Sequence, residues 1–256
     1  MIRILCFSML AMLLLPQSVD AAKRAPVTEK IVFIPHDSRP ISSKQTADVV
    51  QHVGYDIIVP PQELLGNRED WGHPDELWTW VEQNLAQPGV KAAVISSDAM
   101  IYGSLVGSRK HSFTRAQVLE RAARFEGLQK SHRKIPLYVF GSIMRTPRTG
   151  EASGHEEPEY YRRYGADIFR YTVLRDKDEV EGLTRRERKE YDFLGRLIPQ
   201  EALADWMGRR EKNYAVNEYL IDLLRKRNTF RYLTLGRDDN APFSQTHLES
   251  RYLSAA

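Results

Sequence analysis

Charged side chains follow several short apolar runs of this chain directly, which is the pattern of a site built at the ends of strands. Asp98 follows the run 91–96, and the pair Asp238-Asp239 follows the run 231–235. Carboxyl groups in different environments acquire different pKa values, so that one can serve as an acid and another as a base or nucleophile. We therefore predict Asp98, Asp238 and Asp239 as catalytic residues.

Other polar residues at the same positions are suited to binding. Arginine holds carboxylate, phosphate or sugar hydroxyl groups through two hydrogen bonds at once. Each residue also has an alternative role in the fold: Asp37 and Asp98 could cap turns, and Arg145, like Arg148, could be a surface partner of Glu151, Glu156 or Glu157. The predicted substrate-binding residues are Asp37, Arg39, Tyr102, Arg145 and Asn240.

Several motif classes are missing from the sequence. The first apolar run is followed by no G-x-G-x-x-G, and neither G-x-x-x-x-G-K-[ST] nor G-x-S-x-G occurs. Nucleotide binding and a serine-elbow hydrolase are therefore disfavoured. The seven histidines include no H-x-H or H-E-x-x-H pair, so no zinc site and no cofactor are predicted. An oxygen-ligand site for Mg²⁺ or Ca²⁺ at Asp98, Asp238 and Asp239 remains open.

Composition describes a globular protein. The 256 residues are 42% hydrophobic and 28% charged, enough to build a sizeable core. The net charge of +3 is too small to indicate a nucleic-acid partner.

The N-terminus has the pattern of an export signal. Residues 1–22 combine Arg3, the apolar run 4–15 and a small-residue exit, which predicts a cleaved signal peptide followed by a linker at 23–29. The apolar run is shorter than the ~20 residues of a membrane-spanning helix, so no stable span is expected after cleavage. The lone Cys6 lies inside this segment, so the exported chain has no disulfide. We expect a periplasmic or extracellular protein.

Alternating strand and helix patterns predict an α/β domain over residues 30–256. Possible capping boxes at Ser42/Gln45, Thr114/Gln117 and Thr184/Glu187 mark helix starts. A long helical segment, 158–228, precedes the last strand. This alternation predicts a mostly parallel sheet flanked by helices, Rossmann-like or doubly wound, whose ligands bind at the carboxyl ends of the strands. The five expected strands are 30–35, 55–59, 91–96, 137–140 and 231–235.

The C-terminal tail, 243–256, shows no convincing strand or long helix. We therefore expect the flank of the last strand to be open, with an exposed apolar patch. A homodimer or a missing C-terminal half would cover it.

Five ordered blocks of the chain resemble one protein family. The blocks are residues 34–40, 96–109, 143–145, 210–217 and 238–242. Together they are similar to the uncharacterised bacterial family known as domain of unknown function 4127. The resemblance implies no established activity. At the first block the family carries two adjacent acids where this chain has His36-Asp37, and family members are about twice as long, so the resemblance implies an N-terminal half.

From these observations we predict an exported hydrolase that acts on a carbohydrate or cell-envelope glycan through paired carboxylates. Two alternatives remain. One is a non-catalytic exported protein that binds an anionic or polyhydroxylated ligand, and the other is a metal-dependent phosphoesterase. The expected partner in each case is a small molecule or a glycan, with no nucleic acid.

Overall fold

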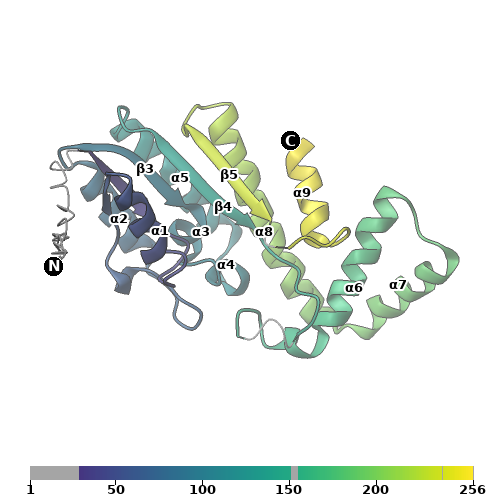
Figure 1. Ribbon diagram of the computed structural model, residues 1–256. Helices are drawn as coiled ribbons and strands as arrows, with labels where there is room; N and C mark the ends of the chain where they lie inside the picture. Colours follow the sequence, from purple (N-terminus) through teal and green to yellow (C-terminus); the bar gives the residue numbers. More distant parts are fainter. Residues whose placement is uncertain (1–28, 151–154, 238, 256) are drawn as a thin grey trace, which may run out of the picture.

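The computed structural model describes residues 29–150, 155–237 and 239–255. At its centre is a five-stranded sheet whose strands all run parallel in the order β2-β1-β3-β4-β5 (Figure 1). This confirms the predicted α/β class. The strands are β1 (Lys30–Ile34), β2 (Asp56–Ile58), β3 (Val90–Ser96), β4 (Leu137–Ile143) and β5 (Tyr232–Arg237).

The strand order reverses once, between β1 and β3. The chain passes from β1 outward to β2, then crosses back so that β3, β4 and β5 extend the sheet on the other side. In open parallel sheets the loops at such a reversal separate, and ligands bind in the crevice beyond the carboxyl ends of the two strands. The exits of β1 and β3 are therefore the first place to look for a site.

Helices cover the two faces of the sheet unequally. The main core lies between one face and four helices, where Ile34, Ile95 and Val139 meet Leu77, Phe125 and Leu220. On the other face α1 (Lys44–His52) covers Phe33 and Ile57 through Ala47. The helices of the main core are α2 (Pro74–Leu85), α3 (Ser97–Tyr102), α5 (Arg115–Ser131) and α8 (Gln200–Arg225).

Two short elements stand in the loops beyond the strands. The 3₁₀ helix η1 (Gln62–Leu64) follows β2, and α4 (Gly107–Lys110) follows α3. Gly103 ends α3 with a φ of 93°, a left-handed conformation that glycine adopts without strain. Its carbonyl accepts a hydrogen bond from Gly66 N, and Gly66 O accepts one from Ser38 N. These bonds join the loops after β1, β2 and β3.

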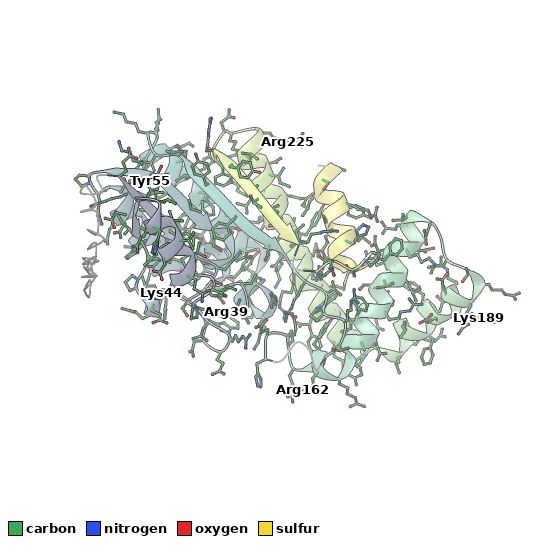
Figure 2. The ribbon with its side chains drawn as sticks, viewed as in Figure 1. Arg39, Lys44, Tyr55, Arg162, Lys189 and Arg225 are labelled. Atoms are coloured by element: carbon green, nitrogen blue, oxygen red, sulfur yellow. The ribbon has the colours of Figure 1, made fainter. Side chains whose placement is uncertain are left out.

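A helical arm extends away from the sheet. It consists of α6 (Tyr160–Val180) and α7 (Arg185–Leu197), with Lys189 near its far end (Figures 1 and 2). The arm joins α8 through a second core that includes Tyr161, Ile168 and Trp206. The predicted helical segment, 158–228, thus consists of the three helices α6, α7 and α8.

Two of the three predicted capping boxes are confirmed. Thr114 and Thr184 cap α5 and α7, and Gln117 and Glu187 complete the reciprocal hydrogen bonds. The box at Ser42/Gln45 is wrong, because α1 begins at Lys44 and no side chain caps it. Instead, the main chain already turns before α1 begins, and the backbone N of Gln45 donates a hydrogen bond to the carbonyl of Pro40.

The tail differs from its expectation. It forms α9 (Gln245–Ala255), which contacts α6, α8, β4 and β5. Capping and periodicity are weak in this segment, and its burial against α8 stabilises it. In the described part of the chain the paired Tyr138 of β4 and Tyr232 of β5 are exposed, Tyr232 by 62%. What covers this face stays a prediction.

The predicted signal peptide and most of the linker lie outside the described residues. Within the described part of the chain, none of the helices combines the length and the apolar character needed to cross a membrane.

Candidate functional site

His36 and Asp98 meet at the reversal point of the sheet. His36 follows β1, and its Nδ1 lies 3.1 Å from Oδ2 of Asp98, which follows β3. The Asp98 residue is 3% exposed, and its Oδ1 accepts a hydrogen bond from Ser142 on β4 at 3.2 Å. The Oδ2 contact is close but not aligned as a hydrogen bond, and no other described group donates to this atom. A buried carboxylate with an unsatisfied oxygen is costly, which is typical of a functional position.

The imidazole ring is held from two further sides. Phe140 packs edge-on against it at 4.7 Å between centroids, and Ser96 Oγ lies 3.0 Å from Nδ1. A serine nucleophile would have to face the ring nitrogen opposite the aspartate. Ser96 faces the same nitrogen as Asp98 and also accepts a hydrogen bond from Ala99 N as the cap of α3. Ser96 is therefore part of the scaffold.

Tyr102 lies behind this pair rather than on an open surface. It is buried and stacks on His111 with 4.9 Å between centroids. Burial, and then the negative charge of Asp98, raise the pKa of Tyr102 well above its ordinary value. Its hydroxyl is therefore neutral at ordinary pH, and a role in binding substrate stays a prediction.

Asp37 and Arg39 form a second unit immediately after His36. Asp37 is fully buried and holds Arg39 in two ways. Its Oδ1 accepts from the backbone N of Arg39 at 3.2 Å, and its Oδ2 accepts from Arg39 Nη2 at 2.7 Å. Asp37 thus both caps the turn and fixes the direction of the guanidinium group.

Glu156, on the loop after β4, gathers four arginines. Oε1 lies 2.9 Å from Arg68 Nε and 3.4 Å from Arg39 Nη1. Oε2 lies 2.8 Å from Arg109 Nη1 and 3.1 Å from Arg145 Nη2. Each arginine follows a different strand, from β1 to β4. The predicted binding residues Arg39 and Arg145 are therefore brought together by a carboxylate that the sequence offers only as a surface partner.

The neighbouring acids Glu156 and Glu157 titrate in opposite directions. Burial alone would raise the pKa of Glu156, but the guanidinium groups of Arg109, Arg145 and Arg39 lower it below its ordinary value. Burial raises the pKa of Glu157, and Arg109 and Arg145 offset only part of this effect. Glu157 accepts a hydrogen bond from Arg145 Nε at 2.9 Å. Compared with a free glutamate, the cluster therefore favours the charged form of Glu156 and the neutral form of Glu157.

Asp239 is engaged by the loops around it. Its Oδ2 accepts from Thr146 N at 2.9 Å, and its Oδ1 accepts from Ala241 N and Ser244 Oγ. It joins the loop after β5 to the loop after β4. Asn240 is exposed. Asp238 lies outside the described residues, so its predicted role is untested.

The described residues contain no preformed cluster of metal-binding side chains. No three His, Cys, Asp or Glu side chains there are close enough to hold an ion together. The open prediction of an Mg²⁺ or Ca²⁺ site also involves Asp238 and stays untested.

Side chains of helix α8 donate hydrogen bonds to the segments that follow β3 and to the end of β4 and the segment after it. Arg210, Asn213 and Asn217 lie on one face because they are spaced by three and four residues. Arg210 donates to the carbonyls of Met144 and Arg145, Asn213 to Ser108, and Asn217 to Ser142. Glu249 of α9 neutralises Arg210 at 2.7 Å. This explains why the block 210–217, which carries no strand exit, belongs with the site.

Four residues of this site, His36, Arg68, Arg109 and Glu156, are not among the residues predicted from the sequence. His36 adjoins a predicted residue and could have been found as a titratable group at a strand exit. Arg68, Arg109 and Glu156 lie within loops and a short helix, so their convergence depends on loop paths that periodicity does not reveal.

Comparison with known proteins gives one match. A family model described as "Protein of unknown function (DUF4127)" matches residues 31–256, which confirms the resemblance seen in the sequence. Searches of curated proteins and of solved structures return no match.

Proposed function

Because this chain belongs to the DUF4127 family, whose description assigns no activity, we propose a function from the site itself: an exported hydrolase that acts on a carbohydrate or cell-envelope glycan. The observation that carries the proposal is the pairing of His36 with the buried Asp98 at the reversal point of the sheet. Export rests on the predicted signal peptide alone.

The chemistry follows from the pair. The Asp98 carboxylate favours a proton on the His36 nitrogen that faces it and stabilises the imidazolium that forms when the ring takes a proton from water. The oxygen of that water attacks the substrate, and the proton passes to the leaving alcohol. A loosely aligned contact in the unliganded protein is compatible with this role, because such bonds tighten in the substrate complex.

Which kind of bond the site can hydrolyse depends on whether a second acid is present. One imidazole suffices for an ester carried by a glycan, whereas a glycosidic bond also needs a group that protonates the leaving oxygen. Asp239 is held by three hydrogen bonds within the fold. The proposal therefore rests on His36 and Asp98, which suffice for an ester carried by a glycan, whereas cleavage of a glycosidic bond would require a further acid.

Activity on a panel of acetylated and acidic glycans tests it, with acetate and new reducing ends as the products measured. Asp98→Asn should lower kcat by about 100-fold or more, because general base catalysis contributes that much, while leaving ligand affinity nearly unchanged. Asp192→Asn, on the exposed surface of α7, is the matched control. Wild-type turnover in Asp98→Asn would contradict the proposal.

A non-catalytic binding protein is the second candidate, favoured by the arginines around Glu156. It predicts that the protein binds acidic glycans but that neither wild type nor any variant hydrolyses them. The metal-dependent phosphoesterase receives no support from the described residues.

A further inference from the structure

A hollow of about 600 Å³ lies next to the loops that leave β1 and β2. Ser38 lines it on the β1 side, and residues of the segment from Gln62 to His73 line the rest. Ser38 follows His36 by two residues, and Figure 2 shows its neighbour Arg39 at the lower edge of the α/β part of the molecule. Along the chain, the hollow therefore adjoins the strand exit that carries His36.

The loop that carries Trp71 is packed tightly against the loop after β3. The backbone N of Gly66 donates a hydrogen bond to the carbonyl of Gly103. Gly72 lies so close to this carbonyl that a Cβ at position 72 would clash with its oxygen. Any other residue would push the two loops apart, so the close approach requires glycine here. The backbone on both sides of Trp71 is thus fixed before any ligand binds.

Trp71 supplies an aromatic surface to the wall of the hollow. Its side chain is 42% exposed, although tryptophan is among the residues that gain most from burial. The ring of Phe113 meets the indole edge-on, with 6.5 Å between centroids. Phe113 in turn stacks on the buried His111, so the indole rests on an ordered aromatic column. Trp71 is therefore held in place and still presents apolar surface to solvent.

Polar groups surround this aromatic surface. Asn67 organises the loop, because its Oδ1 accepts hydrogen bonds from the backbone N of Glu69 and Asp70 and its Nδ2 donates to Asp70 Oδ2. Within the described residues, Asp70 Oδ1 and the side chains of Gln62 and Glu63 form no hydrogen bond or ion pair. Two carboxylates and one amide can therefore bind hydroxyl groups, and the carboxylates would repel an anion.

We propose that this hollow is a subsite for an uncharged sugar ring, whose C–H face stacks on Trp71 and whose hydroxyl groups bind Gln62, Glu63 and Asp70. A sugar ring combines an apolar face with a rim of hydroxyls, which matches an exposed indole flanked by carboxylate and amide groups. The assignment of this ring to the glycan that is hydrolysed at His36 rests on the proposed function, whereas sugar binding itself does not.

Calorimetric titration of the full chain with cellotetraose, the tetramer of N-acetylglucosamine and tetragalacturonate tests the proposal. At least one of the two neutral tetramers should bind wild type more tightly than the acidic one. Trp71→Ala should weaken its binding about tenfold, the order expected when one apolar face is no longer buried. Trp71→Phe keeps an aromatic ring and should lose less. Phe193→Ala removes an equally exposed aromatic side chain on α7 and should bind as wild type does.

A second variant covers the case in which Trp71→Ala does not fold. Gln62 is exposed on η1, so Gln62→Ala should fold normally. It should weaken binding of the same tetramer several-fold, because a hydrogen bond to a hydroxyl group is lost. The proposal is overturned if neither neutral tetramer binds wild type or if tetragalacturonate binds as tightly. Wild-type affinity in every folded variant of Trp71 and Gln62 would also overturn it.

The outcome is separable from that of the proposed function. Binding of a neutral tetramer that depends on Trp71, without hydrolysis of any glycan in the panel, would refute the hydrolase and retain the subsite. Hydrolysis that depends on Asp98, with the same kcat/KM in Trp71→Ala and Gln62→Ala as in wild type, would do the reverse.

Discussion

Buried titratable side chains around the strand exits have pKa values that burial and neighbouring charges move in different directions. The pKa of Glu157 lies above its ordinary value because the side chain is buried, whereas arginines lower the pKa of Glu156. Folding stability linked to Glu157 therefore falls as pH rises above the ordinary range of a glutamate. Stability linked to Glu156 falls as pH drops through its lowered pKa.

His111 gives the clearest test of this kind. Burial lowers its pKa to about 4, and the nearby charges of Lys212 and Arg209 act in the same direction. Its Nε2 lies 2.9 Å from Asn213 Oδ1, and the ring stacks between Tyr102 and Phe113. The unfolded chain takes up this proton near the ordinary value of 6.5, so stability should fall as pH drops from about 6.5 to 4.

The loss should be about 3 kcal/mol, since each unit of pKa corresponds to about 1.4 kcal/mol. Urea unfolding across this range measures it, and His111→Gln should flatten the acid limb. His73→Gln, at an exposed histidine, controls for loss of a ring at the surface. A His111 midpoint near 6.5 in an NMR titration would contradict the buried neutral ring.

Some of the individual residues of the site could be predicted from the sequence. Asp37, Arg39, Asp98 and Arg145 could be predicted because they lie within a few residues of the ends of apolar runs. The structure places all four at one edge of the sheet. Glu156 was weighed only as a surface partner, because nothing local to its loop shows that four arginines converge there.

Among the elements, α8 determines where the exits lie. Arg210 is 1% exposed, pairs with Glu249 and donates to two successive carbonyls after β4. Arg210→Met would leave Glu249 buried without its partner and free the segment that carries Arg145.

We expect Arg210→Met to lower the free energy of unfolding by about 3 kcal/mol or more, as for other broken buried ion pairs. Arg225→Met, at the exposed C-terminal end of the same helix, should change it by less than about 0.5 kcal/mol. Chemical denaturation of both variants compares them directly. Equal stabilities would mean that α8 does not hold the exit in this way.

Elements with local signals were predictable, and those stabilised by tertiary contacts were not. The capping boxes of α5 and α7 are encoded within four residues each. By contrast, α3 and α4 are too short to show periodicity. The tail helix α9 is stabilised by contacts with α6 and α8, and these contacts cannot be predicted from its own residues.

The whole molecule combines a parallel sheet that reverses its strand order once with a helical arm. The alternation of strands and helices predicted the sheet, but the order β2-β1-β3-β4-β5 emerged only from the structure. That order is what brings His36 next to Asp98. Loops that follow four of the strands surround the carboxylate of Glu156. The candidate site therefore lies at the edge of the sheet formed by the carboxyl ends of the strands.

A crystal structure of the Asp98→Asn protein soaked with a glucuronate-containing disaccharide tests this account most directly. The variant should retain the ligand because it lacks the carboxylate that supports the His36 base, so that turnover is slow. We expect the sugars to bind at the exits of β1 and β3, with the bond to be hydrolysed facing His36. Ligand bound only in the hollow of about 520 Å³ between α6, α8 and α9, lined by Arg175, Met207 and Leu248, would contradict the account.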